Sequence, residues 1–325
     1  MVLLKHGNEA PRRGLSHDAR FGARRAFRAP RYALPVVFVT MVLAGCEAEA
    51  PSAEVAPVPA PALAPPAVPP LHGAAARGEM TSLGALLASG VDVDGRGVGR
   101  RTALMFAADG GSGAAAEALL AAGADPDARD ASEVTALMLA ARRARLDVMA
   151  LLLDAGAGID LANDQGTTAL MDAIRSRNAD AVALLLDRGA DLAPASKLGW
   201  TALHFAAASR NRAIAELVIA RVDDLEVRDA AGMTAYLHAA EEGNVANLAL
   251  LEERGVDVAV VDRNGMNAMD HALKQKIWPA VRHLAPLVQP SRMAHLVALY
   301  PEAQAALEAA GFDPTSFAAK AADSR

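Results

Sequence analysis

Cys46 is the only cysteine of the 325 residues, and its thiol is the most reactive candidate group in the chain. A lone cysteine is usually a catalytic nucleophile, a buried structural thiol or a residue without a role. A single cysteine allows neither an intramolecular disulfide nor a zinc site built from cysteines. The residues around Cys46 therefore decide its chemistry.

Two further motifs resemble sites of chemistry. The segment GGSGA, residues 110–114, offers a serine, but it lacks the G-x-S-x-G spacing of a nucleophile and is predicted to be a turn between helices. The segment DVDGRG, residues 92–97, begins like a calcium loop but lacks the later acidic ligands, which favours a hairpin turn.

Methionines and histidines recur at a fixed spacing of 33 residues. Met105, Met138 and Met171 could bind a metal or undergo oxidation, although filling gaps in a core is the favoured interpretation. His238 and His271 lie one repeat apart, too far to share a metal. Since no nucleophile, base and orienting group come together, we predict a non-enzyme without metal or cofactor.

The N-terminal segment 1–45 has the pattern of an export signal. It carries eight Lys/Arg and two Asp/Glu, and it ends in the uncharged apolar stretch 33–45. This stretch is shorter than the roughly 20 residues that a membrane-spanning helix needs. Leu43 to Cys46, L-A-G-C, resembles the lipobox of bacterial lipoproteins. The resemblance implies cleavage before Cys46 and a diacylglyceryl group on its thiol. The alternative is an uncleaved anchor with a free thiol.

The lipobox resemblance also implies a location in the bacterial cell envelope. Several acyl chains, such as palmitate, on Cys46 would anchor the protein stably. In the enterobacterial pattern, Glu47 in place of Asp favours the outer membrane, facing the periplasm, over the inner membrane. The segment RRAF, residues 24–27, resembles a twin-arginine export motif, so the export route stays open. Residues 46–68, rich in Ala and Pro, are predicted to be an extended tether.

From residue 69 the chain repeats every 33 residues without insertion or deletion. Aromatic residues make up only 4% of the chain and apolar residues 53%, which favours closely packed helices. One column of the repeat is entirely alanine, and another is entirely Leu or Val. They comprise Ala74, Ala107, Ala140, Ala173, Ala206, Ala239 and Ala272, and Leu86, Leu119, Leu152, Leu185, Val218, Leu251 and Leu284.

These blocks, such as TALHFAAASR from Thr201, resemble the ankyrin repeat over residues 69–290. The resemblance implies an all-α solenoid of about seven helix-turn-helix-hairpin units, and residues 291–325 are predicted to form C-terminal capping helices. A threonine that begins the first helix of a unit can cap it. These threonines are Thr102, Thr135, Thr168, Thr201 and Thr234. The resemblance also implies that His204 bonds to backbone between repeats.

Ankyrin proteins generally bind partners on their concave side, through hairpin tips and first helices. The resemblance therefore gives candidate contact residues, namely Arg101, Arg129, Arg142, Arg143, Arg175, Lys197, Trp200, Met233 and Met266. Since the whole chain carries −6 and residues 1–45 carry +6, the remainder carries −12. This acidic body excludes a nucleic-acid partner. The basic cluster on it favours a protein partner with an acidic surface, bound by a monomer.

Three functions remain open from the sequence. The first is a scaffold or partner subunit for another protein of the cell envelope. The second is an inhibitor, such as an immunity-type protein that occludes a toxic enzyme. The third, an enzyme with an unrecognised site, has no constellation of residues to support it.

Overall fold

The computed structural model describes residues 70–309 and 311–312. The predicted signal peptide 1–45, the tether 46–68 with Cys46, and residues 313–325 lie outside the described residues. Within the described part, helices and short loops alternate throughout, and one isolated bridge between Ala162 and Thr168 is the only β pairing. The all-α fold class is therefore confirmed.

Seven helix pairs follow one another along the chain. The first helices of the pairs are α1 (Pro70–Arg77), α3 (Ala103–Gly110), α5 (Ala136–Arg142), α7 (Ala169–Ser176), α9 (Ala202–Ala208), α11 (Ala235–Glu242) and α13 (Ala268–Lys274). The second helices are α2 (Met80–Ala88), α4 (Gly113–Ala121), α6 (Leu146–Asp154), α8 (Ala179–Asp187), α10 (Arg212–Ile219), α12 (Val245–Glu253) and α14 (Trp278–Leu284).

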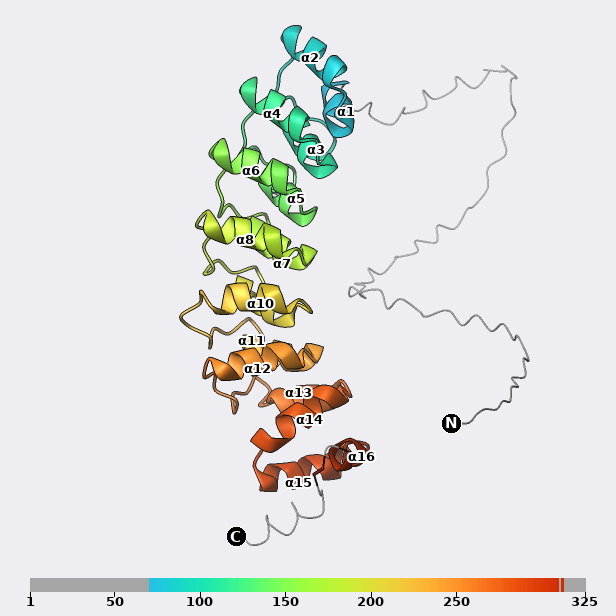
Figure 1. The fold of residues 1–325 in the computed structure, drawn as a ribbon, viewed down its shortest axis with the longest axis vertical. Helices are drawn as coiled ribbons and strands as arrows, with labels where there is room; N and C mark the ends of the chain where they lie inside the picture. Colours follow the sequence, from blue (N-terminus) through green and yellow to red (C-terminus); the bar gives the residue numbers. More distant parts are fainter. Residues whose placement is uncertain (1–69, 310, 313–325) are drawn as a thin grey trace, which may run out of the picture. The chain divides into compact units, whose positions relative to one another are not determined.

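Successive pairs stack in chain order, so that first helices pack on first helices and second helices on second helices (Figure 1). The alanine column is buried throughout because the first helices approach closely there. The leucine column is fully buried from Leu119 to Leu251. A single pair cannot bury these residues, so the stability of the array resides in the contacts between neighbouring units.

Threonines begin the first helices, as the spacing predicts. The hydroxyls of Thr102, Thr135 and Thr168 each accept the backbone N–H three residues later, at 3.4 Å. In α9 the backbone N–H of Thr201 donates to Nδ1 of His204 at 3.2 Å. Thr234 also stands at the N-cap position of its helix, but its buried hydroxyl has no partner. Nothing in the structure explains this exception.

Between the units the chain makes tight hairpins that need one left-handed residue. Gly166 and Gly199 supply it, with φ of 73° and 76°. In the second and third units the same position holds Arg100 and Glu133, with φ of 59° and 61°, and at Arg100 the preceding Gly99 is left-handed as well, with φ of 68°. The backbone therefore keeps its path where the glycine is missing, and a side-chain-bearing residue takes the less favourable conformation.

The C-terminal end of the array is covered by two further helices. After α14 a short 3-10 turn, η2 (Ala285–Leu287), leads to α15 (Pro290–Leu299) and α16 (Ala303–Glu308). Helix α16 packs against α14, and Leu284 is buried. At the other end η1 (Val98–Arg100) lies in the first hairpin. None of the described helices has both the length and the apolar character needed to cross a bilayer.

Candidate partner-binding groove

Hairpin residues and first-helix residues lie on the same side of the array, as at the open depression that Asn163 and Lys197 line together with Arg142 and Arg175. We call this side, which carries the hairpins and the first helices, the groove face. Arginines in the hairpins reach along it from one unit to the next. Nη1 of Arg96 donates to the carbonyl oxygen of Arg129 at 2.7 Å, and Nη1 of Arg228 to that of Val261 at 2.6 Å. Arg129 lies 3.5 Å from the carbonyl oxygen of Ala162 and pairs with Glu133 at 3.0 Å. These arginines therefore tie hairpins together.

Asp109, at the end of α3, forms ion pairs with two of the arginines that were predicted to contact a partner. Arg143 donates to it at 2.8 Å, and Arg101 lies 3.4 Å away with its guanidinium 4.7 Å from the ring centroid of Phe106. Burial raises the pKa of Asp109, but the hydrogen bond from Arg143 and the charges of both arginines outweigh it, so the pKa lies below its usual value. Arg101 is thus half-buried and paired.

Asp172, in α7, forms a second and deeper cluster of the same kind. Its side chain is 0% exposed, although the corresponding residues of the neighbouring units are the apolar Leu139 and Phe205. Arg142 donates to both of its oxygens, at 3.0 and 3.4 Å, and Arg175 donates to one at 3.4 Å. One buried carboxylate therefore fixes the guanidinium groups of two arginines whose side chains are 45% and 58% exposed.

An open depression of about 460 Å³ lies directly at these two arginines. Its wall includes three cations and no acidic residue. The lining residues are Arg142, Asn163, Gln165, Thr167, Arg175, Ser196, Lys197, Leu198 and Phe205. Leu198, at the tip of its hairpin, is 69% exposed, the largest value among the exposed large apolar side chains of the described residues. The depression thus combines positive charge with an exposed apolar side chain.

Trp200 follows this hairpin and packs on the next helices. Its ring centroid lies 4.3 Å from that of His238 and 4.9 Å from that of Phe205. Its half-buried indole therefore joins the fifth unit to the sixth, besides offering surface to a partner. His204, behind it, is fully buried, and its Nε2 lies 3.3 Å from the carbonyl oxygen of Met233 in the next unit.

His204 is held neutral by its surroundings. Burial and the nearby His238 lower its pKa below the usual value. The two imidazole rings meet edge to face, with centroids 5.7 Å apart. Because Nδ1 of His204 accepts the N–H of Thr201, a proton on Nδ1 would break the cap of α9. The neutral ring is thus part of the structure.

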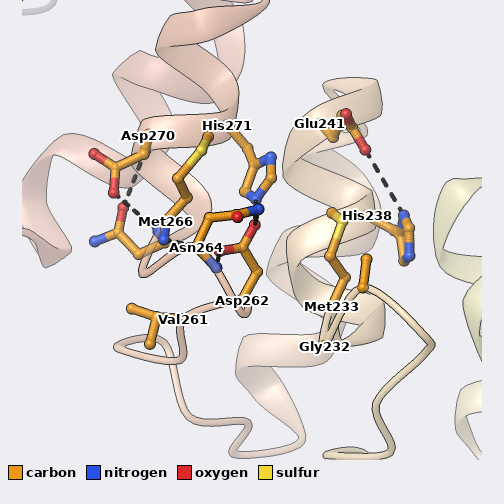
Figure 2. A network of polar contacts seen from close by, with 12 residues as sticks. Gly232, Met233, His238, Glu241, Val261, Asp262, Asn264, Met266, Asp270 and His271 are labelled. Carbon is orange, nitrogen blue, oxygen red and sulfur yellow. Dashed lines mark hydrogen bonds and ion pairs between the residues drawn. The ribbon is translucent and has the colours of Figure 1, made fainter.

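Beyond Trp200 two histidines of the first helices are paired with carboxylates. Figure 2 shows His238 facing Glu241 and His271 facing Asp262, in neighbouring units. Nε2 of His238 lies 2.9 Å from Asp229, and its Nδ1 lies 3.8 Å from Glu241. Nε2 of His271 lies 3.3 Å from Asp262. The two histidines therefore each have their own carboxylate and do not share a site.

The two buried aspartates hold the hairpins as well as the histidines. Oδ1 of Asp229 accepts the N–H groups of Ala231 and Met233, and Asp262 accepts those of Asn264 and Met266. Burial alone would raise the pKa of Asp229, but the two backbone donors and His238 have the larger, opposite effect, so the pKa lies below its usual value. The pKa of Asp262 is depressed in the same way.

The other motifs with possible chemistry have structural positions. Ser112 of GGSGA begins α4 and accepts the N–H of Ala115. Asp94 of DVDGRG accepts the N–H of Asp125 in the next hairpin. Met105, Met138 and Met171 are buried in the stack. Across residues 70–309 and 311–312, no three His, Cys, Asp or Glu residues are arranged to hold a metal ion.

The structure thus separates the predicted contact residues into groups. Arg142, Arg175 and Lys197 meet at the depression. Arg101 and Arg143 pair with Asp109, and Arg129 pairs with Glu133. Trp200 packs on Phe205, which lines the depression. Met233 is buried, at 7% exposed, and offers a partner little surface, while Met266 is half-buried.

Two acidic residues were missed by the sequence reasoning, Asp109 and Asp172. Both organise the arginines of the groove face. Asp172 could have been noticed in the sequence, because the residues 33 positions before and after it are apolar. A charge at such a buried repeat position needs an ion-pair partner once the helices stack.

Comparisons with known proteins agree with this architecture. The family model described as "Ankyrin repeats (3 copies)" matches residues 114–196 and 137–229. No curated protein matches the chain. Among solved structures, the ankyrin repeat domain of Bcl-3, described as a unique member of the IkappaB protein family, is similar with a TM-score of 0.58 and 24% identity. The match covers 66% of this chain and 97% of that one.

The human ASB11 ankyrin repeat domain is similar to the same degree, with a TM-score of 0.58 and 24% identity over 65% of this chain and 96% of that one. At this identity the likeness shows the fold. The family match shows ankyrin repeats within residues 114–229, and the solved structures show the solenoid fold over about two thirds of the chain.

Proposed function

We propose, from the premise that residues 70–309 form an ankyrin-repeat solenoid with its terminal helices, that this protein binds another protein through its groove face. The observation that carries the proposal is the depression at Arg142, Arg175 and Lys197. Its charge is opposite to that of the acidic body, and an exposed leucine stands at its rim. Charge complementarity of this kind steers and orients a partner with an acidic surface.

The proposal includes a lipid anchor at Cys46 in the bacterial cell envelope, on the outer membrane facing the periplasm. Its support is the L-A-G-C sequence at the end of the apolar stretch 33–45. A Cys46→Ser chain is expected to lose acyl labelling and to leave the membrane fraction. Labelling that persists in this variant would end the proposal of a lipoprotein.

The binding role is tested with the full chain, purified in detergent and used to capture envelope proteins. Lys197→Glu with Leu198→Ser changes two exposed side chains at the depression and leaves the Asp172 cluster intact. We expect this variant to capture less partner with an unchanged unfolding midpoint. Arg282→Glu, an exposed charge reversal on α14, is the matched control and is expected to capture normally. Equal capture by both variants would place the binding face elsewhere.

The role as a scaffold or partner subunit and the role as an inhibitor differ in what happens to the partner. A partner enzyme that keeps its activity in the complex supports the first role. A partner whose activity is blocked supports an immunity-type inhibitor. Both roles require the same groove face, so one purified complex decides between them.

A further inference from the structure

We propose that the depression between the third and fifth units takes one kind of ligand, a short acidic peptide segment with an apolar side chain next to its carboxylates. The inference rests on the proposed function and specifies the partner's binding motif. It is argued from the charge, the arrangement and the polarity of the residues that line the depression.

The charge of the depression is not balanced within the described residues. Arg142 and Arg175 share the single carboxylate of Asp172, which leaves one positive charge. Lys197 is exposed and has no ion pair among residues 70–309 and 311–312, which adds a second. The Asp109 cluster differs, because Arg101 is half-buried against Phe106 and no lysine accompanies the two arginines. Two carboxylates would therefore neutralise this depression.

The two guanidinium groups are already in place for a ligand. Arg142 uses Nε and Nη2 on Asp172, whereas Arg175 uses Nη1 alone. The Nε and Nη2 edge of Arg175 therefore has no partner within the described residues, and this edge has the geometry that grips a carboxylate with two bonds. Because Asp172 fixes both arginines beforehand, a ligand loses less side-chain entropy when it binds.

The rest of the lining suits a peptide. Leu198 is exposed beside Lys197, and the half-buried Phe205 lies on the helix behind, so an apolar side chain next to the carboxylates finds apolar surface. Gln165 is exposed and offers its side-chain amide to a peptide backbone, whereas the side-chain oxygens of Asn163 and Ser196 accept N–H groups of their own hairpins and leave their donor groups for a ligand. An inorganic anion would use the cations but would leave this apolar and amide surface unused.

The acidic residues that follow limit the length of the negative segment. Glu241 and Glu242 end α11, in the unit after Trp200. A long polyanion, such as nucleic acid, would meet Glu241 and Glu242 on this side and, on the other side, arginines already paired with Asp109 and Glu133. A short acidic segment can lie over Arg142, Arg175 and Lys197 without reaching them. The groove face thus favours a few carboxylates over an extended negative polymer.

The test selects a displayed library of random dodecapeptides on the full chain held in detergent. We expect enrichment of peptides with two Asp or Glu residues and an adjacent apolar residue. Their affinity should fall about three- to fivefold in Lys197→Gln, because an exposed ion pair is lost, and should weaken with added salt. Arg282→Gln should bind them like the wild type. Arg175→Lys keeps the charge but removes the two-pronged edge, and it should also weaken binding.

Three results would overturn the inference. The selected peptides could lack acidic residues, they could bind Lys197→Gln as tightly as the wild type, or millimolar inorganic phosphate could displace them, which would indicate a simple anion site. If any of these occurs while envelope capture still depends on Lys197 and Leu198, the proposed function stands and this inference fails. If capture is also independent of both residues, the proposed function fails as well.

Discussion

Replacement of Asp172 by leucine tests how the groove face is built. The side chain of Asp172 is fully buried, and the units on either side place Leu139 and Phe205 at the same repeat position. Leucine therefore fits the local packing of first helix on first helix. The variant removes a buried charge and frees two partly exposed arginines, which can return to water.

The magnitude follows from opposing terms. Burial of a carboxylate costs several kcal/mol, and only good pairing offsets this cost. Here the carboxylate is fully buried and its partners are two arginine side chains at 3.0 to 3.4 Å that are about half exposed, so the cost of burial and the gain from pairing nearly cancel. We therefore expect Asp172→Leu to change the free energy of unfolding by no more than about 1 kcal/mol, in either direction.

The matched variant removes the arginines instead. Arg142→Gln with Arg175→Gln leaves Asp172 buried without a cationic partner, and about 3 kcal/mol of destabilisation is expected. Urea unfolding followed by circular dichroism measures both variants. Despite its stability, Asp172→Leu should capture less partner, because the two guanidinium groups are no longer fixed. A loss of more than about 2 kcal/mol in Asp172→Leu would refute the view that Asp172 positions the arginines rather than stabilising the fold.

Three further predictions concern the hairpins and a buried histidine. Glu133→Gly should stabilise the array by up to about 1 kcal/mol in urea unfolding, because glycine adopts φ of 61° without strain. A destabilisation would contradict this and would show that the ion pair between Glu133 and Arg129 contributes more than the strain costs. Gly199→Ala should destabilise by about 2 kcal/mol or more, since φ is 76° and a Cβ would lie 2.8 Å from the nitrogen of Ala230; an unchanged midpoint would contradict this. The depressed pKa of His204 predicts stability that is complete above the unfolded value of about 6.5 and is lost as pH falls toward the folded pKa. Between pH 7.5 and 5.5, wild type should therefore lose more stability than His204→Gln, with the exposed His295→Gln as control; equal losses in wild type and His204→Gln would exclude this role.

The helices and hairpins could be predicted from the sequence because each of them recurs at equivalent positions in successive 33-residue repeats. A strict spacing of 33 residues places Thr102, Thr135 and Thr168 at equivalent helix starts, and the structure has the capping bond at each. The left-handed hairpin positions at Arg100 and Glu133 follow from the same register, even though the glycine is absent.

The candidate site was predicted less completely, because ion pairs between side chains of different units depend on how the units stack, which the sequence does not show. The arginines were visible as a basic cluster, but their partners Asp109 and Asp172 lie 34 and 30 residues from Arg143 and Arg142 in the chain. Arg129 and Met233 were predicted to contact a partner, but stacking of the units engages both of them within the array. The first reaches a carbonyl group 33 residues ahead, and the second is covered by its neighbours. Only the stacked units bring such residues together.

Site-specific photo-crosslinking in cells tests the central claim, that the groove face binds a protein. A photoreactive residue in place of Leu198 stands at the rim of the depression, and one in place of Leu299, at the end of α15, is a control of similar exposure on the capping helices. The account predicts one discrete crosslinked protein from position 198, which is reduced by Lys197→Glu, and none from position 299. No crosslink at position 198, or the same products from both positions, would contradict it.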